Sequence, residues 1–402
     1  MRFRFYLLLS LFALIIFLPN WGEASEGELE HLPKAQYAKA EVFEVETYDL
    51  GGHKDSPIKE ISQQVTLKIL SGKFKGKVVT VDHIASGMMG GEMILKPGNR
   101  VILFVDENPP PAESPDGSPL FNVADYVRDT PIYWLAFFFA LLLVIIGGMK
   151  GVKALVSLVI TICLIFFILF PLTLWGFNPL LVSVLIAGAV SLIVFRIVGG
   201  KSIKSVAAAI GTLLGVAIAG ILAFVVGNMI HLTGMSSEES RILLYSMDLK
   251  INYQGLLFGS ILIGALGAIM DVGMSIASSI DEVRKVHPEA NLQNLFNAGM
   301  NVGRDVMGTM SNTLILAYTG STLPLLLLLI ANNMSFSKIL NMEMIAVEAV
   351  RALAGSIGLV LCIPITALIS AFLYSRPKIK TIIPSSDWLL DKGRAKDDNF
   401  SC

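Results

Sequence analysis

One face of a predicted helix carries small and polar residues in an otherwise apolar sequence. They follow one another at steps of three or four positions and are Ser260, Gly264, Gly267, Asp271, Ser275, Ser278 and Glu282. A carboxylate inside a membrane span is costly unless it is paired or hydrated, so Asp271 is the most informative member. The pattern predicts an ion or proton site, or a residue on a solute pathway. The alternative is a carboxylate near the inner membrane boundary that simply reaches water.

A second polar stripe opens the next predicted helix. Its members recur at helical spacing and are Arg304, Asp305, Gly308, Thr309, Ser311 and Asn312. The predicted spans 255–276 and 309–333 run antiparallel, which would bring Arg304 near Asp271, and an ion pair would lower the cost of both charges. Two facing polar stripes predict a hydrophilic cavity between the helices, or equally a structural hydrogen-bonded contact.

These two stripes supply the predicted pathway or ion site, and a separate pair lies near the outer boundary. The pathway residues are Asp271, Ser275, Ser278, Arg304, Asp305, Thr309 and Asn312. Glu348 and Arg351 are three residues apart, so they can meet on one helical face, and we expect a structural ion pair there.

Signatures of enzymes and metal sites are missing from the sequence. The stretch 195–202 ends like a phosphate-binding loop, but Phe195 stands where the first glycine belongs. The five histidines are scattered without metal-ligand spacing, and no serine lies in a nucleophile elbow. The sequence therefore predicts no enzyme activity, no catalytic residue, no cofactor and no metal.

The composition places these residues in a membrane protein. Only 16% of the 402 residues are charged and 54% are apolar, whereas soluble domains hold about 25% charged residues. The net charge of −1 gives no electrostatic case for binding nucleic acid. Nearly all the apolar excess follows Pro131, so a soluble region precedes a lipid-embedded one.

Seven stretches are apolar enough and nearly all long enough to cross a bilayer, which takes about 20 residues. They are 132–149, 154–174, 179–198, 206–230, 255–276, 309–333 and 344–374. If the preceding domain is outside, most lysines and arginines of the short connections fall inside, as the positive-inside rule requires. We therefore expect a seven-helix membrane domain at 131–376 and a cytoplasmic tail at 377–402.

The N-terminal region predicts an exported β domain. Arg2 and Arg4 precede a short apolar run, which indicates a signal anchor or a signal peptide within residues 1–21. Alternating segments at 30–106 predict five or six strands in a small OB-like or SH3-like barrel outside the membrane. We expect this domain to be structural or to bind a partner. A Pro-rich linker is expected at 107–130.

Two segments resemble a known family. GALGAIMDVGMSIASSIDEV at 264–283 and GRDVMGTMSNTLILAYTG at 303–320 are similar to the YibE/F family of bacterial multi-pass membrane proteins. The resemblance extends over the β domain and the helical part. It implies a bacterial cell-membrane location, but no activity, substrate or catalytic residue set.

The polar stripes favour a transporter or permease-like protein with a route between spans 255–276 and 309–333 for an ion or small solute. The sequence shows no ATP-binding element, so energy would come from an ion gradient or a partner. The alternative is a membrane scaffold or sensor whose outer β domain binds a partner or an envelope component. In either case the chain contacts the lipid bilayer, and a homo-oligomer or a membrane-protein partner is compatible with both functions.

Overall fold

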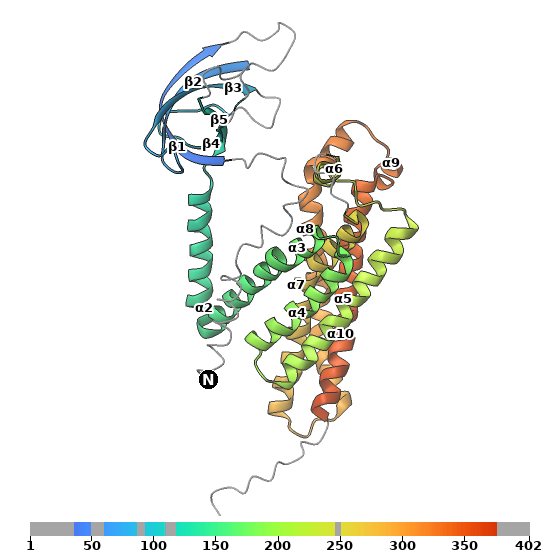
Figure 1. Cartoon of the computed structure of the whole chain (residues 1–402). Helices are drawn as coiled ribbons and strands as arrows, with labels where there is room; N and C mark the ends of the chain where they lie inside the picture. The colour runs from blue at the N-terminus through green and yellow to red at the C-terminus, as the bar shows by residue number, and fades with distance from the viewer. Residues whose placement is uncertain are drawn as a thin grey trace, which may run out of the picture. The chain divides into compact units, whose positions relative to one another are not determined.

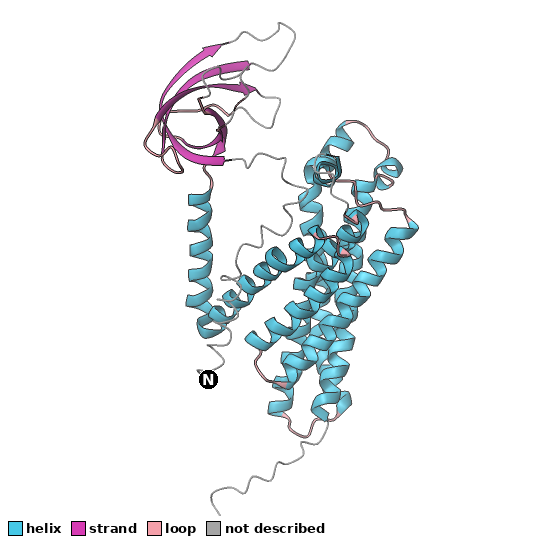
Figure 2. Cartoon of the chain, in the orientation of Figure 1, coloured by secondary structure: helices cyan, strands magenta, loops and turns pink. Residues whose placement is uncertain are grey.

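The computed structural model describes residues 36–49, 60–86, 93–107, 109, 118–245 and 251–375. The predicted signal segment at 1–21 and the predicted tail at 377–402 lie outside these residues. The chain divides into two compact units, residues 1–138 and 139–402. The described strands all belong to the first unit, and the second unit is helical (Figure 1, Figure 2).

The first unit is a small antiparallel half-barrel. Its strands are β1 (Gln36–Asp49), β2 (Glu60–Ile69), β3 (Val78–Ser86), β4 (Arg100–Asp106) and β5 (Leu120–Tyr126), in the sheet order β3-β2-β1-β4-β5. Side chains alternate across a strand, so Ala38, Ala40 and Val42 of β1 share the buried face of the sheet. The five strands agree with the predicted number.

The predicted linker at 107–130 is wrong in its second half, because this part is a strand. β5 pairs with β4, and Phe121 lies opposite Val105 in the register. The buried ring of Phe121 meets Phe74 edge-on, with 5.5 Å between ring centroids. Five prolines at 109–119 directly precede this short strand, and their pattern is typical of a linker rather than of a strand. The β domain therefore extends to Tyr126.

A buried glutamine fastens the segment before β4 to the sheet. Gln63 on β2 is 1% exposed. Its side-chain oxygen accepts from the main-chain N–H of Leu95 at 2.7 Å, and its side-chain nitrogen donates to the Leu95 carbonyl at 3.1 Å. The same nitrogen lies 3.2 Å from Thr47 Oγ1. Gln63 thus satisfies two main-chain groups that a hydrocarbon side chain would leave unpaired.

We expect Gln63→Leu to destabilise the β domain by about 1–3 kcal/mol, because both main-chain groups of Leu95 would be buried without partners. Hydrogen exchange of the full-length protein would show faster exchange at residues 93–96. The neighbouring Gln64→Leu is the control, since Gln64 is exposed on the opposite face. Equal protection of residues 93–96 in the two variants would contradict this role of Gln63.

The second unit contains most of the helical segments that are long and apolar enough to span a membrane, of which the described residues hold six. The segments are α2 (Asp129–Leu164), continued by η2 (Ile165–Leu169) and α3 (Phe170–Leu174), then α4 (Pro179–Val198), α5 (Ile203–Met229), α7 (Tyr253–Val286), α8 (Leu292–Ala331) and α10 (Glu343–Ser375). Two short helices, α6 (Glu238–Tyr245) and α9 (Phe336–Leu340), lie between them. The predicted spans 132–149 and 154–174 both fall in the first segment, so the number of seven is not reproduced.

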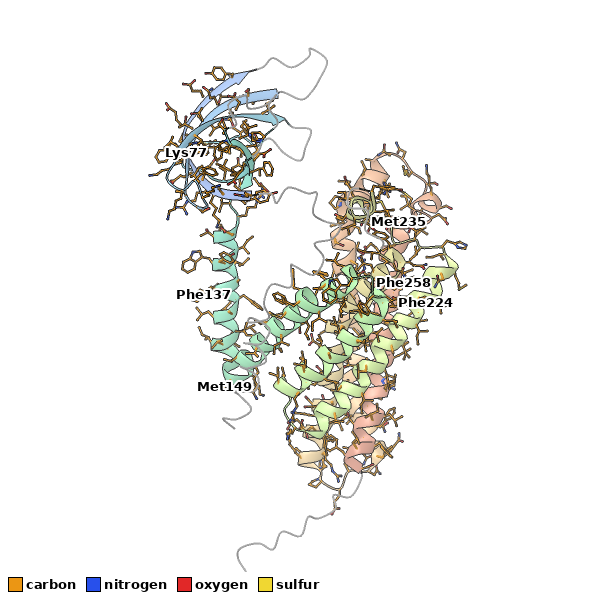
Figure 3. The ribbon with its side chains drawn as sticks, in the orientation of Figure 1. Lys77, Phe137, Met149, Phe224, Met235 and Phe258 are labelled. Atoms are coloured by element: carbon orange, nitrogen blue, oxygen red, sulfur yellow. The ribbon has the colours of Figure 1, made fainter. Side chains whose placement is uncertain are left out.

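Helix α7 is the centre of the bundle and packs against α4, α5, α8 and α10. Its buried face includes Phe258, whose ring packs against Phe224 of α5 with 5.7 Å between centroids (Figure 3). The most extensive helix contact joins α5 to α10, and glycines make it possible. A Cβ on Gly358 of α10 would lie 2.6 Å from the carbonyl oxygen of Gly215 on α5. Small residues allow this close approach in lipid, where helices have no hydrophobic reason to associate.

Helix α8 differs from the prediction at its start. In the sequence, apolar residues and Gly299 share one helical face over 292–302, and this pattern predicts an amphipathic helix lying at the inner surface, apart from the span 309–333. The structure instead shows one continuous helix of 40 residues. The apolar side of its first turns packs on protein, because Gly299 contacts Ile280 of α7 and Ala367 of α10.

Candidate functional site

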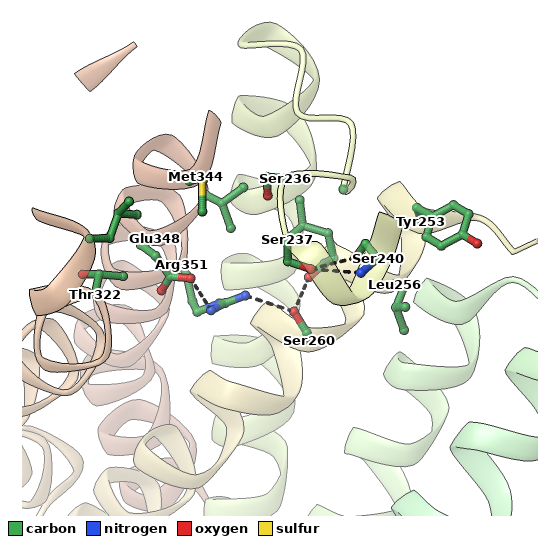
Figure 4. A pocket seen from close by; sticks show the side chains of 14 residues that line it. Ser236, Ser237, Ser240, Tyr253, Leu256, Ser260, Thr322, Met344, Glu348 and Arg351 are labelled. Carbon is green, nitrogen blue, oxygen red and sulfur yellow. Dashed lines mark hydrogen bonds and ion pairs between the residues drawn. The ribbon is translucent and has the colours of Figure 1, made fainter. Parts of the chain in front are cut away.

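A pocket of about 360 Å³ lies at the end of the bundle where α7 and α10 begin. Its wall comes from the loop before α6, the first turns of α6, α7 and α10, and the later part of α8 (Figure 4). The polar residues that line it are Ser236, Ser237, Ser240, Tyr253, Ser260, Thr322, Glu348 and Arg351.

The loop before α6 is held in place by main-chain geometry and by α10. Gly234 has a φ of +78°, and a Cβ there would collide with the carbonyl of Tyr253, so the position requires glycine. The carboxylate of Glu343 accepts from the N–H of Thr233 at 2.7 Å and from its hydroxyl at 2.8 Å. These contacts bring the loop residues Ser236 and Ser237 to the pocket wall.

An ion pair forms one side of the pocket. Arg351 Nη1 donates to Glu348 Oε1 at 2.6 Å, and Arg351 Nη2 lies 3.4 Å from the hydroxyl of Ser260 (Figure 4). The guanidinium carbon lies 5.8 Å from the ring centroid of Tyr318. Glu348 Oε2 and Arg351 Nε are buried and have no hydrogen-bond partner within the described part of the chain. Buried charged groups with unused atoms are expensive, so this pair has hydrogen-bonding capacity left for a ligand.

Serine hydroxyls form another part of the pocket wall. The hydroxyl of Ser237 lies 3.0 Å from that of Ser240 and accepts from the N–H of Ser240 at 3.2 Å, which fixes the first turn of α6. The hydroxyl of Ser260 donates to the carbonyl of Leu257 at 2.7 Å. Hydroxyl groups both donate and accept, so this wall can adapt to a polar ligand.

The predicted stripe of α7, hereafter the α7 stripe (Ser260, Gly264, Gly267, Asp271, Ser275, Ser278 and Glu282), lies on the outward face of the helix. Asp271 and Ser275 are exposed, and Ser278 is half-buried. A Cβ on Gly267 would have no heavy atom within 4 Å, so the surface beside Asp271 is open. The stripe begins at Ser260, which also lines the pocket.

The predicted residues of α8 are exposed as well, and they do not face Asp271 as an ion-paired partner. Arg304, Asp305, Thr309 and Asn312 are all exposed. Within the described part of the chain, no ion pair joins Arg304 to Asp271, so that expectation is corrected. The reason is packing: Gly303 fits against Ile276 of α7 and Ile363 of α10, and the next residue of a helix points about 100° away.

Sequence reasoning missed most of the pocket. The sequence does not single out Ser236, Ser237, Ser240 or Thr322, because isolated hydroxyl residues in loops and spans show no helical spacing. Glu348, Arg351 and Ser260 were each noticed on their own helices. One feature of the sequence indicates the pocket: Glu348 and Arg351 lie at the start of an apolar span, where charged side chains need polar neighbours.

Comparison with protein families agrees with the resemblance seen in the sequence. A family model described as YibE/F-like protein matches residues 135–376, and a model described as the YibE/F family N-terminal domain matches residues 34–111. No curated protein and no solved structure matches the chain. The two family matches cover the helical part and most of the β domain, and the chain belongs to the YibE/F family.

Proposed function

We propose that the protein moves a small solute or ion across the membrane, through the pocket and along the α7 stripe. The observation that carries the proposal is the position of Ser260, which lines the pocket and is the first residue of the stripe. From there, polar and small residues follow one face of α7 to Glu282, near its other end. A polar line that starts in a pocket and follows a spanning helix is what a hydrated route requires.

The proposed route continues past a carboxylate with no side-chain partner. Among the described residues, no ion pair or side-chain hydrogen bond satisfies Asp271, which is exposed on α7. Lipid offers no hydrogen bonds, so a charge at this depth needs water or a counter-charge. Water along the α7 stripe would hydrate Asp271, and the solute would move through the same water.

We propose further that a second copy of the chain closes the open side of this route. Asp271 and Arg304 are both exposed, carry opposite charges and lack an ion-pair partner among the residues that the structure describes. In a two-fold symmetric contact the same surface of each copy faces the other copy. Arg304 of one copy can therefore pair with Asp271 of the other, and the reverse pair forms as well. This contact would remove four charged side chains from lipid.

The first helical segment bears on the orientation of the route. At Gly148 the backbone leaves the helix, with φ 52° and ψ −133°. The carbonyl of Leu143 lies where a Cβ of Gly151 would be, although these residues would be about 12 Å apart along a straight helix. We propose that this reversal separates two crossings and that the nearby Lys150 and Lys153 lie inside, as the positive-inside rule favours. Seven crossings would then leave the β domain outside and the C-terminus inside, with the pocket on the outer side.

Cysteine labelling tests the route. Gly267→Cys, with Cys163, Cys362 and Cys402 replaced by alanine, should react with a hydrophilic maleimide in membranes, because the reagent needs water at the stripe. The matched control is Ile221→Cys on α5, whose exposed apolar side chain predicts contact with lipid and no reaction. Reaction of both cysteines only with a lipid-soluble maleimide would end the proposed route.

The Gly267→Cys variant also tests the second copy. The cysteine should form a cross-linked dimer with a short bifunctional thiol reagent, whereas Ile221→Cys should remain monomeric. Hydrophilic labelling without any cross-link would keep the hydrated route and reject the second copy as its wall.

A further inference from the structure

Three helices direct their N-terminal ends at the pocket. Ser237 immediately precedes α6, Tyr253 is the first residue of α7, and Met344 is the second residue of α10; all three line the pocket. The N-terminal end of a helix carries a partial positive charge, from its aligned peptide dipoles and its first N–H groups. Glu238 and Glu239 stand in the first turn of α6 and Glu343 in the first turn of α10, whereas the first turn of α7 holds no acidic residue. The end of α7 is therefore the one that favours a negatively charged ligand.

The side chain of Arg351 supplies a positive group with an unused binding edge. Glu348 engages only Nη1, at 2.6 Å. Nη2 has a long contact of 3.4 Å to Ser260, and Nε is buried and has no hydrogen-bond partner among the residues that the structure describes. Nε and Nη2 form one edge of the planar guanidinium group, and such an edge binds the two oxygens of a carboxylate or a phosphate through parallel hydrogen bonds. The better edge of Arg351 is therefore not used by its internal partner.

The remaining lining groups suit an oxyanion. Glu348 and Arg351 are the charged side chains among the lining residues, so their charges cancel, and the end of α7 adds a partial positive charge to the cavity. The hydroxyls of Ser236 and Ser240 can donate to oxygen, whereas the hydroxyl of Thr322 already donates to the carbonyls of Tyr318 and Thr319. A volume of about 360 Å³ accommodates a small oxyanion together with water or an attached organic group.

We propose that the pocket binds a small oxyanion of the phosphate or carboxylate type on the Nε and Nη2 edge of Arg351. Glu348 acts as an internal competitor that holds the guanidinium while the pocket is empty. The binding site stands on the pocket alone. That the bound anion is the transported solute rests on the proposed function.

The two members of the ion pair should respond in opposite directions. Titration calorimetry of the purified full-length protein in detergent, with inorganic phosphate and with acetate at constant ionic strength, should show saturable binding that sodium chloride does not reproduce. Arg351→Gln should weaken binding about tenfold or more, because a charged hydrogen-bond partner is lost. Glu348→Gln should tighten it, because the competing carboxylate is gone. Tighter binding of phosphate than of acetate would identify the phosphate type, and the reverse would identify the carboxylate type.

Controls keep the outcome interpretable. Arg241→Gln removes a nearby charge that does not line the pocket and should bind as the parent protein does. If Arg351→Gln does not fold, Glu348→Gln still decides, since weaker binding in that variant would show a cationic or zwitterionic ligand and overturn the proposal. Equal heats for phosphate, acetate and chloride would overturn it as well. Oxyanion binding without any flux would reject the proposed function and leave this site intact.

Discussion

Asp271→Asn should abolish flux through the protein while the folded protein remains at its normal yield. Asparagine has nearly the same shape as aspartate, and Asp271 is exposed and makes no side-chain hydrogen bond among the described residues, so packing is preserved. What is lost is the carboxyl group of Asp271 on the α7 stripe, which can bind and release a proton as an anion crosses, whereas an amide cannot. In proteoliposomes, uptake of labelled inorganic phosphate and proton movement reported by an internal pH dye should both fall by about tenfold or more, equivalent to ~1.4 kcal/mol in the barrier.

Two further variants show whether the loss of flux is specific to the polar stripes. Asp305→Asn should reduce flux in the same way, because Asp305 belongs to the second polar stripe. Glu289→Gln makes the same change of charge in the exposed connection between α7 and α8 and should leave flux unchanged. Full flux in both aspartate variants would remove the transport mechanism in this form.

Deletion of the β domain separates transport from the scaffold or sensor function. Because β5 belongs to the sheet, the deletion has to cover residues 36–126; a shorter deletion that ended in the predicted linker would leave an unpaired strand. Normal flux after this deletion, together with loss of flux in Asp271→Asn, would assign the activity to the helical unit.

The sequence predicted the helices well where hydropathy and capping agree. Helix α4 begins and ends at the predicted residues, because Asn178 caps its start, Pro179 occupies the first turn and Gly199 follows its end. Helix α8 was misjudged at its start because hydropathy measures apolar length, and the first four turns of α8 are polar on their exposed side. Its apolar face is used for packing against α7 and α10, which a span-counting argument does not consider.

The pocket could not be predicted, since its parts are distant in the sequence. Ser260 and Arg351 are 91 positions apart, and Thr233 and Glu343 are 110 positions apart. Periodicity places residues on the face of one helix but does not reveal which faces of different helices meet. The α7 stripe was visible because all its members share one helix, whereas the pocket depends on the packing of α7, α8 and α10.

Gly358→Val should destabilise the helical bundle, because α5 and α10 are in close contact at this glycine. The added Cβ would lie 2.6 Å from the carbonyl oxygen of Gly215 and 2.7 Å from the Cβ of Ala219, closer than such atoms approach in proteins. The first of these neighbours is a backbone atom, so relief requires the two helices to separate. Overpacking of this kind costs about 1–3 kcal/mol, and helix association in lipid depends on tight packing of small residues.

Denaturation of the purified protein in mixed micelles of increasing SDS content would measure this loss of stability. Gly320→Val on α8 is the matched control, because the same change is made inside a helix but its Cβ meets no heavy atom within 4 Å. Each variant loses one helical glycine and gains the same β-branched side chain, so the change in helix propensity cancels in the comparison. Unfolding at the same SDS fraction in both would show that the α5–α10 contact has room to spare. An earlier transition in Gly358→Val alone would establish that this contact holds the bundle, and with it the pocket at the start of α10, together.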